Sequence, residues 1–192
     1  MSHVMLRRFA WLWLLLAVAP AQASTVPYNI DARYATIEFT TSGLFATQGY
    51  FQKFTGNLAL DFAAPEHSSV SVTVDDSAIV MSWPPGVQML KSASYFDSAA
   101  YPHIRFRSTS ITPGANPGQY VMEGELTIRG ITKPQKMIAT LLSAPAGGTN
   151  AGTADFYVTG TLHRSDFGMV ADKAAVDDAV VLKIHARVIE QK

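Results

Sequence analysis

Three residue types that together can form a hydrolase triad stand close to one another in the segment LHRSDFGM: His163, Ser165 and Asp166. The same segment contains Asp166-Phe167-Gly168, a tripeptide of protein kinases, but the sequence lacks the glycine-rich loop and the lysine strand of a kinase. On a strand, His163 and Ser165 would share one face at about 6.6–7 Å while Asp166 lay on the other, whereas triad partners must approach to about 3 Å. We therefore expect a strand end that bends at Gly168 and buries Phe167.

Other catalytic and metal-binding patterns are missing from the sequence. The chain has no cysteine, which excludes disulfides, thiolate metal sites and cysteine nucleophiles. The histidines are His3, His67, His103, His163 and His185. No two of them have the i, i+4 spacing that places two ligands on one helix face. The acidic pairs Asp75-Asp76 and Asp177-Asp178 are typical of turns at strand ends. We expect no catalytic residue, no cofactor and no metal.

The N-terminus has the pattern of a secretory signal peptide. Arg7 and Arg8 precede an apolar run over residues 9–19, and Ala21-Gln22-Ala23 forms a small-x-small cleavage site. An apolar run of 11 residues is shorter than the roughly 20 needed to span a bilayer. We therefore expect residues 1–23 to be a cleaved signal peptide and the protein to be exported to the periplasm.

The rest of the chain, residues 24–192, has the size of one domain with a substantial core. The signal segment contains two basic residues and no acidic one, so 13 Lys and Arg remain beside 15 Asp and Glu, a net charge of −2. This near-neutral balance argues against a nucleic-acid partner. We expect a single soluble domain over residues 24–192.

Alternating apolar and polar residues recur along this domain and indicate strands with one buried and one solvated face. The clearest examples are residues 37–40, 58–62, 70–74, 104–107 and 182–188. By alternation and turn signals we count about eight to ten strands. Residues 111–120 and 143–153 are rich in Pro, Gly and small residues and are expected to be exposed loops.

One short helix is expected to interrupt the strands. It would begin at a capping Ser82, carry Pro84 and Pro85 in its first turn and run to about Ser92. Many strands, one helix and no βαβ rhythm predict an all-β antiparallel barrel or sandwich. A closed barrel of about eight strands has an interior that either side chains or one slender ligand can fill. The alternation of apolar residues is compatible with both possibilities.

The inward-facing residues of the strands are the candidate ligand-binding residues. A shift of one residue would bury Glu38, Arg105 or Lys183 in a dry interior, so the apolar phase of each strand must face inward. The set comprises Ile37, Phe39, Leu58, Leu60, Val70, Val72, Ile104, Phe106, Phe156, Leu182 and Ile184.

Five longer segments carry a further signal. They are YNID (28–31), GYFQKFTGNLALD (49–61), LKSASYFDSAAYPHIRFRST (90–109), GELTIRGITKP (124–134) and RSDFGM (164–169). In this order they span nearly the whole domain and resemble the YceI-like family of exported lipid-binding proteins. The resemblance implies a lipocalin-like barrel whose apolar tunnel holds a polyisoprenoid or another long-chain amphiphile without catalysis. Burial of about 20 carbons at ~0.8 kcal/mol each would give a gross ~16 kcal/mol before binding costs.

Two positions depart from the family pattern. Ser42 and Gly43 stand where many members have a histidine, and Val87 and Met89 stand where they have an Asp-x-His. We therefore expect a more apolar tunnel mouth and do not carry over the head-group contacts of typical members.

Two other functions remain open on sequence alone. The first alternative is an envelope interaction module with a solid barrel core and a protein partner, and the second, more distant, is an exported hydrolase. A homodimer is compatible both with lipid binding and with the interaction module.

Overall fold

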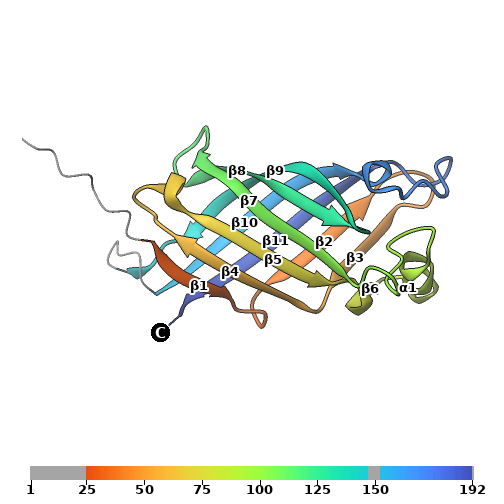
Figure 1. Cartoon of the computed structure of the whole chain (residues 1–192), viewed down its shortest axis with the longest axis horizontal. Coiled ribbons are helices and arrows are strands. Elements are labelled where there is room, and N and C mark those ends of the chain that lie inside the picture. Colours follow the sequence, from red (N-terminus) through yellow and green to blue (C-terminus); the bar gives the residue numbers. More distant parts are fainter. Residues whose placement is uncertain (1–24, 147–151, 192) are drawn as a thin grey trace, which may run out of the picture.

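The computed structural model of the chain describes residues 25–146 and 152–191. The expected signal peptide, residues 1–23, lies outside the described residues. The structure is built mainly of strands, with one α-helix and short 3₁₀ turns (Figure 1). The strands are β1 (Val26–Ile30), β2 (Thr36–Thr41), β3 (Thr47–Phe51), β4 (Phe54–Leu60), β5 (Ser69–Asp75), β6 (Ile79–Met81), β7 (His103–Pro113), β8 (Gln119–Ile128), β9 (Ile131–Ser143), β10 (Thr153–His163) and β11 (Ala179–Glu190). The helix is α1 (Pro84–Lys91), and the 3₁₀ turns are η1 (Pro65–His67), η2 (Asp76–Ala78) and η4 (Arg164–Phe167).

The strands form one closed antiparallel barrel, as the resemblance implied. β1 and β2 both pair with β11. On their other side, β4 pairs with β1 and β3 pairs with β2. Next in the wall, β5 pairs with β4 and β6 pairs with β3. The consecutive strands β1 and β2 therefore form one interrupted strand of the wall, as do β3 and β4, and β5 and β6. With β7 to β11 they make an eight-stranded wall in which chain neighbours are also spatial neighbours. This arrangement is the up-and-down barrel.

The barrel closes where its first strand meets its last. Tyr28 pairs with Glu190 and Ile30 with Val188, and β2 continues the contact with β11 from His185 to Val180. Between β1 and β2 the chain leaves the wall for five residues, 31–35. Closure removes the free strand edges that an open sheet would expose.

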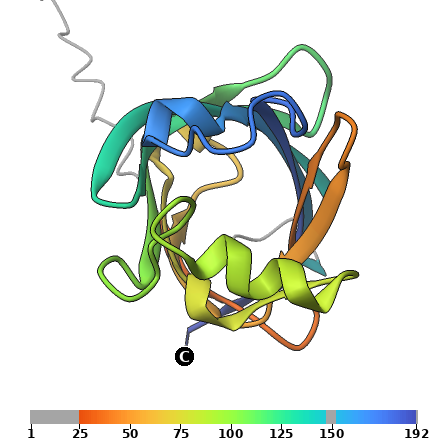
Figure 2. The same cartoon turned by 90° about the vertical axis from the view of Figure 1, so that its right-hand side faces the viewer.

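The two ends of the barrel differ in construction. The helix end, as we name it, holds the β2–β3 turn (residues 42–46), α1 with the segment up to residue 102, and residues 164–178 (Figure 2). The terminal end holds residue 25, residue 191 and the connections 61–68 and 114–118. In Figure 2, which looks onto the helix end, α1 lies across part of the barrel rim.

The helix begins one residue later than its sequence predicts. Trp83, not Ser82, is the N-cap, and no side chain caps the helix. Trp83 is extended, with φ −113° and ψ 99°, because the ring of the following Pro84 disfavours helical backbone in the residue before it. The expected proline in the first turn and the end at Ser92 are both present.

Candidate ligand-binding site

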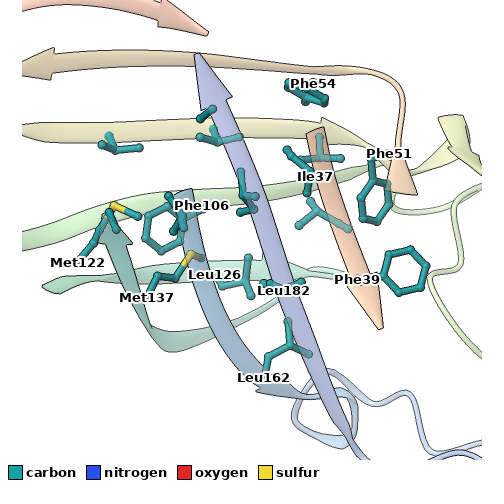
Figure 3. A pocket seen from close by; sticks show the side chains of 18 of the residues that line it. Ile37, Phe39, Phe51, Phe54, Phe106, Met122, Leu126, Met137, Leu162 and Leu182 are labelled. Atoms are coloured by element: carbon teal, nitrogen blue, oxygen red, sulfur yellow. The ribbon is translucent and has the colours of Figure 1, made fainter. Parts of the chain in front are cut away.

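The barrel encloses a cavity with a volume of about 240 Å³ that runs through its interior. Its wall is almost wholly apolar. All eleven residues predicted to face inward line it: Ile37 and Phe39 on β2, Leu58 and Leu60 on β4, Val70 and Val72 on β5, Ile104 and Phe106 on β7, Phe156 on β10, Leu182 and Ile184 on β11. Figure 3 shows several of these side chains converging on the cavity. Their contact with a ligand stays a prediction.

Sequence reasoning missed part of the lining. Met122 and Leu126 on β8 and Met137 on β9 point into the cavity (Figure 3), and the alternation of β8 was a signal that could have found the first two. Met89 and Tyr95, from α1 and the segment after it, also line the cavity. Those two come from non-strand segments, where a period of two carries no information.

Two glycines let aromatic rings lie flat on the barrel wall. A Cβ at Gly49 would lie 2.5 Å from Cζ of Phe39, and a Cβ at Gly124 would lie 2.6 Å from Cζ of Phe106. Such distances are far below van der Waals contact, so each ring occupies the space that a side chain on the neighbouring strand would need. The rings are thereby kept against the wall, and the centre of the cavity stays open.

The cavity is long and narrow. Five alternate residues of β11, from Val180 to Val188, line it. Eight steps of about 3.3 Å make this lining about 26 Å long, or roughly 20 Å along the axis at a usual strand tilt of about 40°. This length exceeds the roughly 15 Å of one bilayer leaflet's hydrocarbon. A volume of about 240 Å³ over that length fits one slender chain rather than a bundle of chains.

Aromatic side chains narrow both ends. At the terminal end, the rings of Phe62 and Phe156 stack with centroids 6.2 Å apart. At the helix end, Phe51 contacts Phe39 at 5.6 Å and Phe96 at 6.0 Å between ring centroids. Aromatic pairs of this kind add to the stability of the fold beyond the contribution of the apolar area that they bury.

One charged side chain lines the cavity within the described residues, that of Arg164 at the helix end. It is 4% exposed, and its guanidinium donates to four backbone carbonyls: Nε to Asp177 at 3.1 Å, Nη1 to Met169 at 2.9 Å and to Ala171 at 2.6 Å, and Nη2 to Val176 at 2.9 Å. Four of its five N–H groups are thus used, which offsets the cost of burying the charge.

The Arg164 bonds fix the segment of residues 168–178 over the helix end of the cavity. Gly168 begins that segment with a φ of 74°, and Phe167 before it is 1% exposed, as its sequence predicts. Tyr95 adds a second tie, because its hydroxyl donates to Asp172 at 2.6 Å. Burial, reinforced by this hydrogen bond, raises the pKa of Tyr95 to about 12.

The two departures from the family pattern both lie at the helix end. Ser42 and Gly43 form part of the β2–β3 turn, and Val87 and Met89 lie on α1. Met89 lines the cavity and Val87 packs against the core. Of these four positions, the two on α1 are therefore apolar in this chain.

The carboxylate that contacts His163 and Ser165 is Asp178, not the Asp166 of the candidate triad, and the order of these three groups does not suit triad catalysis. Asp178, rather than histidine, is the central group: it accepts from Ser165 Oγ at 2.8 Å and lies 3.4 Å from His163 Nδ1. Burial alone would raise the pKa of Asp178, but the hydrogen bonds from the hydroxyl and amide of Ser165, together with the charges of His163 and Arg164, hold that pKa below its usual value. A triad needs histidine between serine and carboxylate. None of the three residues lines the cavity.

Residues 25–146 and 152–191 contain no group of three or more His, Cys, Asp or Glu side chains that could hold a metal ion. They also contain no helix with the length and apolar character to cross a bilayer.

A buried carboxyl group, that of Asp76, lies outside the cavity, between η2 and the start of β7. Asp76 is 1% exposed, and its Oδ1 lacks a hydrogen-bond partner, as do Ser98 Oγ and His103 Nδ1 within the described residues. Burial raises the pKa of Asp76, and the neighbouring Asp75 carboxylate adds to the effect. The neighbouring Asp75 has a lowered pKa instead, chiefly because its carboxylate accepts from Ser77.

These opposite shifts predict opposite effects of pH on two asparagine variants. The folded state favours protonated Asp76, so its ionisation destabilises the protein increasingly as pH rises from 3.8 through the raised folded-state pKa. Asp76→Asn should therefore gain stability over wild type at neutral pH and lose that advantage below pH 4. Asp75→Asn should lose stability at neutral pH, with the loss vanishing as pH falls through the depressed pKa. Urea unfolding between pH 3 and 8 measures both, and equal pH dependence of the two variants would contradict the assignment.

Comparisons with known proteins match nearly the whole chain. The model of the YceI-like domain matches residues 28–188. A UPF0312 protein of Pseudomonas putida is 32% identical over 97% of this chain and 98% of its own length. A UPF0312 protein of Photorhabdus laumondii is 29% identical over 93% of both chains.

Solved structures share the fold. The crystal structure of Burkholderia cenocepacia BcnA superposes with a TM-score of 0.74 at 23% identity, over 82% of this chain and 98% of that one. A polyisoprenoid-binding domain from Saccharophagus degradans, implicated in plant cell wall breakdown, superposes with a TM-score of 0.62 at 13% identity, over 86% and 99%. At these identities the likeness establishes the fold alone.

Proposed function

The chain belongs to the YceI-like domain family, and from this premise we propose that it is a non-catalytic binding protein that holds one long apolar lipid inside its barrel. The observation that carries the proposal is the cavity: a closed, almost wholly apolar interior with a volume of about 240 Å³. A solid core, which the interaction-module alternative required, would leave no such space. The described polyisoprenoid binding of the Saccharophagus degradans domain supports the same ligand class.

The shape of the cavity favours a single-chain ligand. Its lining reaches roughly 20 Å along the axis, longer than one leaflet's hydrocarbon, and its width suits one chain. Binding free energy in such a tunnel comes from apolar burial, at about 0.8 kcal/mol for each methylene removed from water. A polyisoprenoid or a similar long-chain amphiphile has the required length and slenderness, whereas a two-chain phospholipid is too broad.

The polar end of the ligand is best accommodated at the helix end. Arg164 lies there as the one cation of the described lining, and one of its N–H groups remains after its four carbonyl bonds. A hydroxyl, carboxylate or phosphate oxygen is a suitable acceptor for that group. With Val87 and Met89 apolar, Arg164 is the one charged contact that the described lining offers on this side.

The site of action that we propose is the periplasm, reached through cleavage of residues 1–23. The support is the pattern of Arg7 and Arg8, the apolar run and the Ala21-Gln22-Ala23 site. Sequencing the N-terminus of exported protein should identify Ser24 as the first residue, and an intact Met1 would contradict export by cleavage.

Extraction of the purified protein with organic solvent, followed by mass spectrometry, tests the ligand. We expect about one long-chain lipid for each protein molecule. Delipidated protein should then bind linear isoprenols with an affinity that rises with chain length and levels off once the chain fills the tunnel. An empty extract, together with no binding of any isoprenol, would reject the carrier function in favour of a protein-interaction role.

A further inference from the structure

Large apolar side chains protrude from the helix end of the barrel. Leu44 and Phe45, at the tip of the β2–β3 turn, are 80% and 64% exposed, and Trp83, just before α1, is 55% exposed. Isolated exposed apolar residues are common on protein surfaces. Here, however, three large apolar side chains lie on adjoining loops at one end of the molecule, and we refer to Leu44, Phe45 and Trp83 as the apolar tip.

The backbone holds these loops together. β6 pairs with β3 through Met81 and Gly49, so the residues that follow Met81, Trp83 among them, lie beside the β2–β3 turn. On its other side the turn is bonded to the segment over the cavity, by Phe45 N to Ala175 O at 2.9 Å and Asp177 N to Ser42 O at 3.0 Å. The apolar tip is therefore a fixed feature of the rim, close to the segment that Arg164 anchors.

The two chain segments that form the tip are uncharged. Residues 39–52 and 77–90 contain no Asp, Glu, Lys or Arg, although such residues make up 16% of the whole chain. Their polar side chains are Ser, Thr, Gln and Tyr, which tolerate the interfacial layer of a bilayer. A charged side chain carried into hydrocarbon would cost several kcal/mol, and these two segments carry none. The exposed charges beside them, Asp172, Lys173 and Asp177, lie on the adjoining segment of residues 168–178 and would have to stay on the water side of the interface.

The cavity reaches the base of the same turn. Thr41 and Thr47, the last pair of residues before the turn, are half-buried and line the cavity, as does Met89 of α1. A ligand that enters between the turn and α1 would pass the apolar tip first.

We propose that the apolar tip inserts into the surface of a lipid bilayer, so that the helix end of the barrel opens toward the membrane from which the cargo comes. The proposal rests on the proposed function, since a long-chain lipid resides in bilayers and would have to cross water to reach an undocked barrel. Tryptophan, phenylalanine and leucine are the residues that anchor proteins at bilayer interfaces. Single side chains on protruding loops suit a fluid surface, whereas a protein partner requires a broad complementary patch.

Tryptophan fluorescence provides a direct test. In the chain that begins at Ser24, Trp83 is the single tryptophan, because the other two lie in residues 1–23. Vesicles of pure phosphatidylcholine should shift its emission to shorter wavelength and should carry the protein down in sedimentation. Because the tip is uncharged, binding should change less than twofold between 0.05 and 0.5 M salt.

Matched variants separate the tip from general adhesion. Leu44→Ser combined with Phe45→Ser should lower the vesicle-bound fraction at least tenfold, with thermal unfolding unchanged because both side chains are exposed. Leu142→Ser removes a residue that is 56% exposed toward the terminal end and should bind vesicles like wild type. If the double variant binds like wild type, or the wild type binds only anionic vesicles, the docking proposal is wrong. A wild type that ignores vesicles yet yields lipid on extraction overturns the docking alone and leaves the carrier function standing.

Discussion

Replacing Arg164 with methionine is expected to lower the free energy of unfolding by about 3–5 kcal/mol, the range for breaking a buried charged network. The reason is the set of four carbonyl oxygens, of Met169, Ala171, Val176 and Asp177, that would lose their donors. Methionine has a similar length but cannot donate. Each buried acceptor left without a partner costs about 1–3 kcal/mol, less whatever water recovers.

Chemical denaturation and thermal melting measure this effect. A loss of this size should lower the melting temperature by roughly 10 °C for a domain of this length. Arg105→Met is the control, because Arg105 lies on the outer face of β7 and is exposed. It should change stability by no more than about 0.5 kcal/mol. Should the Arg164 variant lose under 1 kcal/mol, the guanidinium does not hold the segment of residues 168–178.

Replacing Ile184 with tryptophan is expected to empty the tunnel. Ile184 lies near the middle of β11, faces the cavity and is only half-buried because empty space lies beside it. An indole ring there should project into the narrow lumen and block the path of a long chain. We expect at least a tenfold fall in the lipid recovered by extraction, together with a modest stability loss of about 1–3 kcal/mol from local overpacking.

Lys183→Trp supplies the matched control for this variant. Lys183 precedes Ile184 on the same strand and is exposed on the outer face, so the same ring is added outside the wall. Its lipid content should equal that of wild type. Equal lipid content in both variants would mean that the ligand does not occupy the middle of the barrel.

The alternation of apolar residues predicted most of the barrel, because a wall with one dry and one wet face constrains every second residue. Ile37 and Phe39, for example, could face only inward once Glu38 was assigned to solvent. The same reasoning could have reached Met122 and Leu126 on β8, which keep the same period. The candidate set was therefore incomplete on strands where the rule was not applied, and in non-strand segments, such as those of Met89 and Tyr95, where the rule gives no information.

Other features depend on contacts between distant segments and could not be predicted from local pattern. The LHRSDFGM segment predicted a strand end that bends at Gly168, but the 3₁₀ turn before that bend was not predicted: β10 ends at His163 and Arg164 begins η4. The chain reverses direction after Arg164, and this brings its guanidinium into hydrogen-bonding distance of backbone carbonyls that lie 5 to 13 positions further along the chain. The break between β1 and β2 is likewise set by how both strands meet β11.

The seam between the first and last strands also has a consequence for folding order. Most strand pairs of the barrel join neighbours in the chain and can form early. The β1–β11 pair joins residues from opposite ends of the domain and therefore carries the largest loop-closure cost. Until Ala179–Glu190 is in place, the sheet stays open and its apolar face is accessible along its whole length. A lipid that is present during folding could thus lie in the open sheet before the last strand shuts it in, a kinetic route to loading that needs no entrance in the finished barrel.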